Sequence, residues 1–208
     1  MLQSEWVFIF VFFVCAGLAN SIYLTYHHYR TNILHPLAKS FCAISETIDC
    51  DRVATSFGSK LAGIPVASLG MFAHFFLLFY ALTEPVLKLG IHVELYCSIY
   101  VIVWIMLLFC AYEAFVSFII LRLVCIMCAV IYATVALMLV SCKHALAMTH
   151  EDIFSLLYNL FLPSLSSCIL KKGLIAMTAA VALSAVIAFV IDYLFKAHFT
   201  KKSLLTKQ

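Results

Sequence analysis

Five long apolar stretches are the feature that most constrains what this chain can fold into. They cover residues 6–26, 63–82, 95–115, 123–140 and 174–195. Each is close to the roughly 20 residues that a helix needs to cross a ~30 Å hydrocarbon core. The stretches are continuously apolar, whereas the strands of a membrane barrel alternate apolar and polar residues. With 65% hydrophobic and only 11% charged residues, a soluble domain is excluded. The sequence predicts an all-α integral membrane protein with five transmembrane helices.

The connections between these stretches differ in length. The third and fourth stretches are separated by little more than a turn that contains Arg122, so we expect a tight helical hairpin. The long connection after the fourth stretch has apolar residues at positions 153, 156, 157, 160 and 161, which is the spacing of one helix face. Ten residues are too few to span, and this pattern predicts an amphipathic helix on the membrane surface.

Two of the nine cysteines form a C-x-x-C motif at the start of the fourth stretch. Cys125 and Cys128 fall on one face of a helix, close enough to form a disulfide. The helix N-terminus and Arg122 place positive potential near Cys125, which predicts that its thiolate is favoured. The alternative is that two small polarizable side chains pack at a helix interface.

A second pair lies in the polar connection between the first two stretches. Cys42 and Cys50 are eight residues apart, and such a pair by itself is typical of a structural disulfide. However, this connection and the start of the fourth stretch lie on the same side of the membrane, because the chain has crossed an odd number of times in both cases. The two pairs can therefore meet. A dithiol above a membrane-embedded dithiol is suited to passing electrons from a water-side protein to an acceptor dissolved in the lipid.

The other five cysteines have no partner at short spacing. Cys15, Cys97 and Cys110 lie in or at the edges of apolar stretches and are interpreted as packing residues. Cys142 and Cys168 fall on the side opposite to the two pairs, where free thiols are expected.

Several motifs together resemble the vitamin K epoxide reductase family, over about residues 5–141. The resemblance rests on four features: Ser21-Ile22-Tyr23-Leu24; Cys42 with Cys50-Asp51-Arg52-Val53, Thr55 and Ser56; Gly63-Ile64-Pro65-Val66 with Gly70; and the C-x-x-C followed by Tyr132. The fifth stretch and the Gly-Ile-Pro-Val opening are similar to bacterial members rather than to the four-span animal enzymes.

This resemblance implies a four-helix bundle around a quinone, with a short helical extramembrane loop over it. Cys42 and Cys50 are implied to be the shuttle pair, and Cys125 and Cys128 the active pair. The chain would then divide into a catalytic bundle at 1–141 with its redox loop at 27–62, a cytoplasmic connection at 142–173 that holds the amphipathic helix, the fifth helix at 174–195 and a basic tail at 196–208.

Three further residues are candidates for contact with the quinone. Tyr132 lies one helical turn beyond Cys128 on nearly the same face, so its hydroxyl is placed to hydrogen-bond a quinone carbonyl. An ordinary bundle tyrosine is the alternative. Ser56 and Phe57 follow the shuttle pair on a segment able to cap the bundle. No metal site is expected.

The expected function is that of a multi-pass, disulfide-forming oxidoreductase of the bacterial inner (cell) membrane. A periplasmic thioredoxin-fold (DsbA-like) protein would reduce the Cys42–Cys50 disulfide, at the more peripheral Cys42. Cys50 would then attack Cys125, and the deeper Cys128 would pass electrons to ubiquinone or menaquinone. Many bacterial relatives carry a fused thioredoxin-like domain, whereas this chain ends thirteen residues past Phe195, so a separate partner is expected.

The orientation follows from chemistry rather than from charge. Lys and Arg are more numerous on the side of the two cysteine pairs, nine against four, which by the positive-inside rule would place that side in the cytoplasm. Without the basic tail the counts are nearly equal. A quinone-coupled oxidant is useful where disulfides persist, so we expect the cysteines to face the periplasm.

Other functions stay open at this point. The same scaffold is compatible with reduction of vitamin K quinone or epoxide. Another family of four-span, quinone-linked disulfide oxidases has its C-x-x-C early and its second pair later, the reverse of the order here. A copper-binding protein would use soft ligands such as Met106 and Met127, but His27, His28 and His74 are not at ligand spacing with the C-x-x-C. A structural scaffold would leave the four cysteines without a reason.

Overall fold

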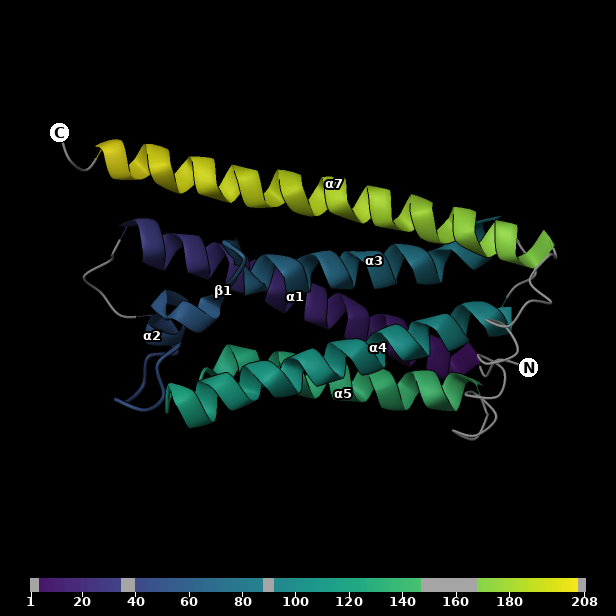
Figure 1. Ribbon diagram of the computed structural model, residues 1–208, viewed down its shortest axis with the longest axis horizontal. Coiled ribbons are helices and arrows are strands. Elements are labelled where there is room, and N and C mark those ends of the chain that lie inside the picture. The colour runs from purple at the N-terminus through teal and green to yellow at the C-terminus, as the bar shows by residue number, and fades with distance from the viewer. Residues whose placement is uncertain (1–3, 35–39, 88–91, 147–167, 206–208) are drawn as a thin grey trace.

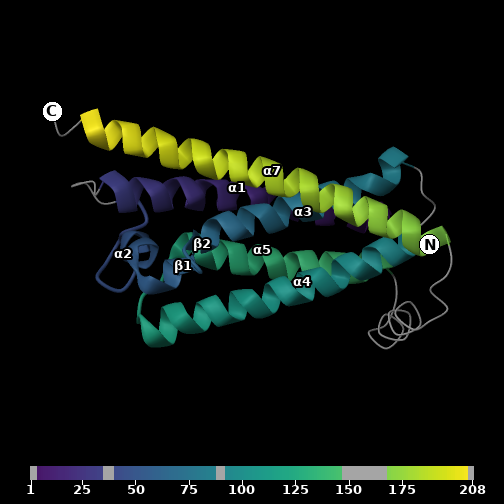
Figure 2. The same ribbon diagram turned by 45° about the horizontal axis from the view of Figure 1, so that its top comes forward.

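The computed structural model describes residues 4–34, 40–87, 92–146 and 168–205, and five of its helices are long and apolar enough to cross a membrane. These helices are α1 (Ser4–Leu34), α3 (Val66–Leu87), α4 (His92–Phe115), α5 (Ile126–Leu146) and α7 (Cys168–Leu205). The predicted all-α, multi-pass membrane fold is confirmed. Helices α1, α3, α4 and α5 form the bundle, and α7 lies along its α1 and α3 side (Figures 1 and 2).

The bundle is held together by apolar side chains from all four of its helices. Phe10, Leu77, Tyr100 and Met138 come from α1, α3, α4 and α5 and are almost completely buried in one cluster. In a membrane the lipid tails are as apolar as these side chains, so close packing between helices is what stabilises such a core.

The N-terminus and the C-terminus lie at opposite ends of the bundle (Figure 1). The C-terminal end of α7 shares its end of the bundle with α2 (Cys50–Thr55). Five crossings require this arrangement, because an odd number of spans brings the chain out on the far side.

Helix α1 is longer than predicted. The redox loop was expected to begin at residue 27, but α1 continues for two more turns. These turns are polar yet buried, since His27 is 2% and Thr31 8% exposed. The Thr31 hydroxyl donates to the carbonyl of His27 at 2.8 Å, and the Asn32 amide donates to the carbonyl of Ala54 at 2.9 Å. The polar residues stay helical because the loop that follows covers them.

Helix α7 is also longer than the predicted fifth span at 174–195. Residues 196–205, expected as a tail, continue the same helix. No glycine or proline follows residue 173, and Phe199 is 2% exposed because its ring packs on that of Tyr26, 5.2 Å away between centroids. The amphipathic helix predicted around 153–161 lies outside the described residues.

A half-buried carboxylate attaches α7 to the bundle. Asp192 accepts hydrogen bonds from the hydroxyl of Tyr29 in α1, at 2.8 Å, and from the hydroxyl of Ser68 in α3. One side chain of α7 therefore contacts both helices on which it lies.

The second span begins later than predicted, because its first residues form a hairpin. Strands β1 (Lys60–Leu61) and β2 (Ile64–Pro65) pair antiparallel across Ala62 and Gly63. Both turn residues have positive φ, 51° and 84°, as a tight two-residue hairpin turn requires. Glycine adopts this conformation at little cost, which explains Gly63.

The expected hairpin between the third and fourth spans is present. Helix α4 runs into a π-helical segment, η2 (Val116–Ile120), and the chain then reverses at Arg122, whose φ is 54°. Ser117 closes the turn: its hydroxyl donates to the carbonyl of Leu123 at 2.7 Å, and its carbonyl accepts from the Leu123 N–H at 3.0 Å.

Candidate functional site

Residues 40–59, which precede β1, fold into a small cap at one end of the bundle (Figure 1). A β-bridge pairs Ala43 with Asp49, and the N–H of Ile44 donates to the carbonyl of Ile48 at 2.9 Å. Asp49 is the N-cap of α2, since its carboxylate accepts from the N–H of Arg52 at 3.0 Å. Cys50 follows this N-cap and is the first residue of α2.

The cap is joined to the connection between α4 and α5 by backbone hydrogen bonds. The N–H of Val124 donates to the carbonyl of Thr47 at 2.7 Å, and the N–H of Asp49 donates to the carbonyl of Val124 at 3.1 Å. Thr47 and Asp49 lie shortly before Cys50, and Val124 directly precedes Cys125. These hydrogen bonds therefore hold Cys50 beside Cys125.

The four predicted cysteines come together in one continuous series. Hydrogen bonds link Cys42 to Cys50, Cys50 to Cys125, and Cys125 to Cys128. The first three thiols are 1%, 2% and 3% exposed and pack as one cluster. The cysteines thus contact one another in the same order in which the predicted path passes electrons from Cys42 to Cys128.

Cys125 lies just before α5 rather than inside it, which corrects the prediction that both cysteines are helical. Its sulfur accepts a hydrogen bond from the N–H of Cys128 at 3.3 Å, as an N-cap side chain does. The predicted preference for a thiolate is not found in this reduced form. The hydrogen bond to the Cys128 thiol, together with burial, raises the pKa of Cys125.

The shuttle pair is likewise held as neutral thiols. Burial and the hydrogen bond to Cys50 raise the pKa of Cys42 to about 11, and the hydrogen bond to Cys125 and burial raise the pKa of Cys50. Cys42 is the member of the series farthest from Cys128, as expected for the peripheral thiol. It is nevertheless buried, with the hydroxyl of Ser40 3.3 Å from its sulfur. The Cys42 thiol is therefore covered by the cap in this structure.

A polar network that sequence analysis missed supports the cap from below. The Nε2 atom of His27 lies 2.8 Å from Oδ1 of Asp51, and the N–H of Ser40 donates to Oδ2 of Asp51 at 2.9 Å. Burial acts to raise the pKa of Asp51, but these hydrogen bonds outweigh it and hold that pKa below its ordinary value. The available signal was an aspartate that directly follows Cys50.

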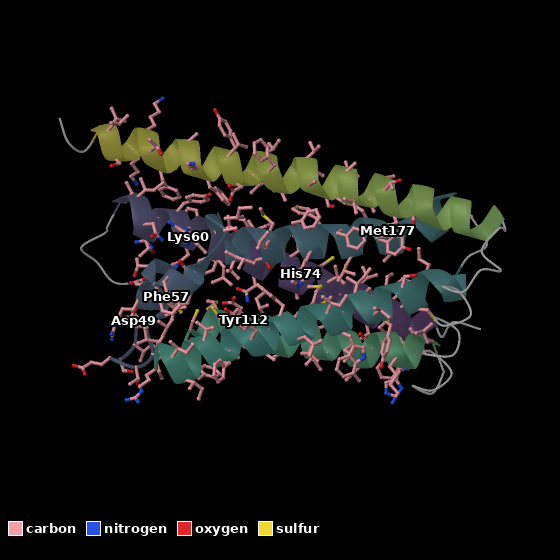
Figure 3. All side chains as sticks on the ribbon, viewed as in Figure 1. Asp49, Phe57, Lys60, His74, Tyr112 and Met177 are labelled. Atoms are coloured by element: carbon pink, nitrogen blue, oxygen red, sulfur yellow. The ribbon has the colours of Figure 1, made fainter. Side chains whose placement is uncertain are left out.

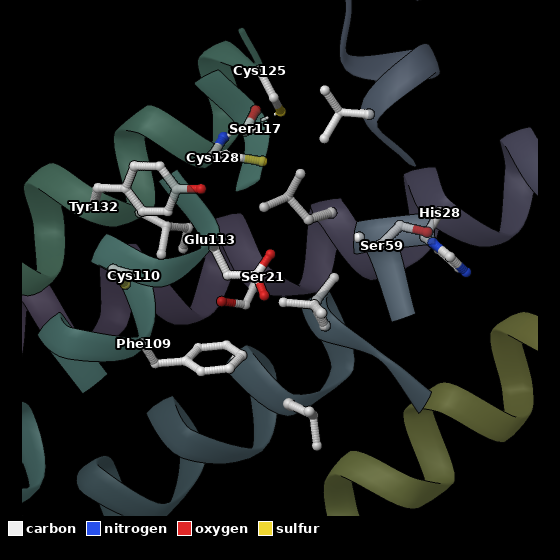
Figure 4. A pocket seen from close by; sticks show the side chains of 18 of the residues that line it. Ser21, His28, Ser59, Phe109, Cys110, Glu113, Ser117, Cys125, Cys128 and Tyr132 are labelled. Atoms are coloured by element: carbon white, nitrogen blue, oxygen red, sulfur yellow. Dashed lines mark hydrogen bonds between the residues drawn. The ribbon is translucent and has the colours of Figure 1, made fainter. Parts of the chain in front are cut away.

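An apolar cavity of about 370 Å³ lies inside the bundle next to the active pair (Figure 4). Cys50, Cys125 and Cys128 line it, whereas Cys42 does not. The series of thiols thus begins beneath the cap and ends at the cavity.

Two of the three predicted quinone contacts line this cavity. Tyr132 and Ser56 do so, but Phe57 does not, and its side chain is 70% exposed. Figure 3 shows Phe57 at the cap end of the bundle. The short helix η1 (Phe57–Ser59) turns Gly58 and Ser59 toward the cavity instead. A Cβ at Gly58 would lie 2.9 Å from the Val116 side chain, so glycine permits this close approach.

Sequence analysis missed three polar residues of the cavity wall: Ser21 of α1, His74 of α3 and Glu113 of α4. His74 is fully buried, and its Nδ1 lies 2.7 Å from the carbonyl oxygen of Gly70. Glu113 is the one charged residue in the stretch 95–115. An ionisable residue in a membrane span is itself a signal for a functional site, and it was available from the sequence.

The remaining described cysteines lie apart from the series. Cys15 is exposed on α1, Cys97 and Cys142 are buried in the bundle, and Cys110 lines the cavity. The Cys142 thiol donates to the carbonyl of Tyr96 at 3.6 Å. Within the described residues, no group of three or more His, Cys, Asp or Glu side chains is arranged to hold a metal ion.

Comparison with known proteins identifies the family of this chain. A search of curated proteins finds no match to the chain. A family model described as the vitamin K epoxide reductase family matches residues 8–142, which include α2, all four cysteines of the series and nearly all of the four bundle helices. Because this match covers well over half of the sequence, the chain belongs to the vitamin K epoxide reductase family.

Proposed function

We propose that this chain forms disulfides by passing electrons from a periplasmic thioredoxin-fold protein, through Cys42 and Cys50 and then Cys125 and Cys128, to a membrane quinone. Membership of the family supports a quinone- or epoxide-linked thiol oxidoreductase in general. The observation that carries the finer proposal is the unbroken hydrogen-bonded series of four thiols that ends at an apolar cavity.

The cavity fits a quinone head group. Its volume of about 370 Å³ lies within the ~300–1,000 Å³ of typical small-molecule sites, and its wall is mostly apolar with a few polar groups. When bound, ubiquinone or menaquinone supplies the terminal acceptor of two electrons. Tyr132 lines the cavity with a hydroxyl group able to donate to a carbonyl oxygen, and Cys128 opens onto the same space. Ser56 also lines the cavity, but its hydroxyl donates to the carbonyl of Val53 at 2.7 Å.

Electrons pass between the pairs by thiol–disulfide exchange, in which a new S–S bond forms for each S–S bond that breaks. The partner's thiolate attacks Cys42 of the Cys42–Cys50 disulfide, and its second thiol then closes the partner's own disulfide, which leaves Cys42 and Cys50 reduced. The Cys50 thiolate attacks Cys125 of the oxidised active pair and releases Cys128. Cys42 then closes on Cys50 and releases Cys125.

The geometry favours this order. Cys50 contacts both Cys42 and Cys125, so it is the thiol able to bridge the two pairs. Exposed apolar side chains next to Cys42, those of Phe41 and Ile44, offer a surface to a protein donor, with 69% and 65% exposure.

A quinone-reduction assay tests the proposal. The purified protein receives dithiothreitol and a short-chain ubiquinone analogue, and quinone absorbance is followed. Wild type should reduce the quinone, and Cys125→Ala and Cys128→Ala should each abolish the reaction, since the electron path is cut. Cys15→Ala is the matched control, because Cys15 is exposed and outside the series. Wild-type turnover in Cys128→Ala would overturn the assignment.

We further propose that the cap faces the periplasm of a bacterial inner membrane. Disulfides persist there, and the quinone pool keeps that compartment oxidising. A reporter that is active only in the periplasm should be active when fused after Gln208 and inactive when fused after Leu146, because α7, which is long and apolar enough to cross the membrane, lies between the two positions. The reverse pattern in a functional protein would show that the charge count gives the true orientation.

A further inference from the structure

Glu113 is an acid placed inside the apolar cavity without an assigned role. It comes from α4, and its carboxyl points into the cavity on the side of Tyr132 and Cys128, near Ser21 (Figure 4). Among the residues that the structure describes, no basic side chain forms an ion pair with Glu113 and no group hydrogen-bonds its carboxyl.

The surroundings of Glu113 favour its neutral form. An ionised carboxylate at membrane depth is costly unless a cation or several donors compensate it, and the described wall of the cavity supplies neither to Glu113. A protonated carboxyl has one O–H donor, and here that donor faces an apolar space. Such a group is satisfied best by an oxygen atom of a bound molecule.

Glu113 and Tyr132 face the same part of the cavity from two neighbouring helices. Figure 4 shows the Tyr132 hydroxyl on the same side of the cavity as the Cys128 thiol, and Glu113, Tyr132 and Cys128 all line it. The carboxyl in α4 and the hydroxyl in α5 therefore form a pair of donors beside the thiol at the end of the series. Two donors at one end of an apolar cavity suit the recognition of a carbonyl oxygen on a ring that is otherwise apolar.

We propose that Glu113 is a further quinone-binding residue of this chain, whose protonated carboxyl donates a hydrogen bond to a carbonyl oxygen of the quinone head group. This inference rests on the function proposed above. Oxidation of Cys125 and Cys128 to a disulfide releases two electrons and two protons, and conversion of a quinone to a hydroquinone takes up the same number of each. Glu113 holds a proton at its carboxyl oxygen. When that proton passes to the quinone oxygen, a proton released from the dithiol reprotonates Glu113.

Three variants separate this role from a structural one. Glu113→Gln keeps a donor but cannot release a proton, Glu113→Leu removes both, and Tyr112→Phe is the control. Tyr112 is the neighbour of Glu113 on α4, but its side chain is 56% exposed and does not line the cavity. Size-exclusion chromatography and thermal unfolding in detergent show which variants fold.

The first measurement is calorimetric binding of a short-chain ubiquinone analogue. Loss of a hydrogen bond from a buried donor weakens binding about tenfold in Glu113→Leu, whereas Glu113→Gln stays within about threefold of wild type. Tyr112→Phe binds as wild type does. Turnover with dithiothreitol falls in both Glu113 variants, because neither can hold a proton at this position.

The second measurement is infrared difference spectroscopy on addition of the same analogue. Wild type and Tyr112→Phe should show a shift in the C=O stretching band of a protonated carboxyl, and Glu113→Gln should lack it. A structural role for Glu113 would not move this band. The proposal is overturned if the band persists in Glu113→Gln, or if Glu113→Leu binds the analogue as tightly as wild type. Failure of wild type to reduce any quinone would instead refute the proposed function itself.

Discussion

The backbone N–H of Val124 donates to the carbonyl oxygen of Thr47 at 2.7 Å, and these two residues lie 77 positions apart in the chain. The N–H of Asp49 donates in turn to the carbonyl of Val124. Together the two bonds pair the cap with the connection between α4 and α5, as a strand pairs with the edge of a sheet. Contact between Cys50 and Cys125 is therefore set by main-chain geometry, and the two redox pairs remain in register while the cap stays closed.

The first prediction concerns the intermediate of transfer between the pairs. Cys42→Ala removes the thiol that resolves a bond between Cys50 and Cys125 in the proposed order of transfer, and the contact between Cys50 and Cys125 favours that bond. In the presence of quinone and without a small thiol, the variant should accumulate a Cys50–Cys125 disulfide, detected by non-reducing peptide mapping. The double variant Cys42→Ala/Cys50→Ala is the control that cannot form it. Finding Cys50 free, with Cys125 joined only to Cys128, would contradict the proposed order of transfer.

The second prediction concerns the choice of electron donor. Cys42→Ala should lose at least tenfold in oxidation of a reduced thioredoxin-fold protein but keep part of its activity with dithiothreitol, because only a small thiol can reach the active pair without the shuttle. Cys42 is the outermost thiol of the series, so a folded donor meets it first. Both rates are measured by quinone absorbance, with Cys15→Ala as control. Unchanged oxidation of the protein donor in Cys42→Ala would rule out the shuttle.

The third prediction concerns the stability of the cap at low pH. The folded-state pKa of Asp51 is depressed, so its stabilising effect is complete above its unfolded value of about 4 and is lost as the pH falls through the folded pKa. The protection factors of α2 amides in wild type, which are corrected for the intrinsic exchange rate at each pH, should therefore fall below about pH 4. Asp51→Asn should show lower protection factors at neutral pH and little further change on acidification. Glu46→Gln is the control, because Glu46 is exposed on the same cap. A steep acid dependence retained in Asp51→Asn would assign the effect to other groups.

The fourth prediction concerns the attachment of α7. Asp192→Leu removes the acceptor for both Tyr29 and Ser68, which leaves two buried hydroxyl groups unsatisfied. The free energy of unfolding should fall by about 1–3 kcal/mol for each lost partner, seen as a lower Tm in detergent. Tyr193→Phe is the neighbouring control, since Tyr193 is 61% exposed. An unchanged Tm in Asp192→Leu would show that packing alone holds α7 on the bundle.

Local sequence patterns were least reliable where tertiary contacts cover polar residues. His27 and Thr31 were assigned to a loop because they are polar, but the cap buries them and α1 continues. Phe57 was assigned to the cavity because it follows Cys42 and Cys50 on a segment able to cap the bundle, but η1 turns Gly58 inward in its place. Neither outcome is encoded in the period or composition of the segment itself.

The sequence by itself determined the number of spans, the side shared by the two cysteine pairs and the candidate identity of all four redox cysteines. The number of spans depends on the length of the apolar stretches, the shared side on whether the number of crossings is odd, and the cysteine candidates on their spacing. Each of these can be read or counted along the chain. The tertiary structure was needed to show that Asp51 and His27 support the cap and that Glu113 faces the cavity. These facts depend on how helices distant in the chain rotate against one another, and that rotation is set by the packing of the whole bundle.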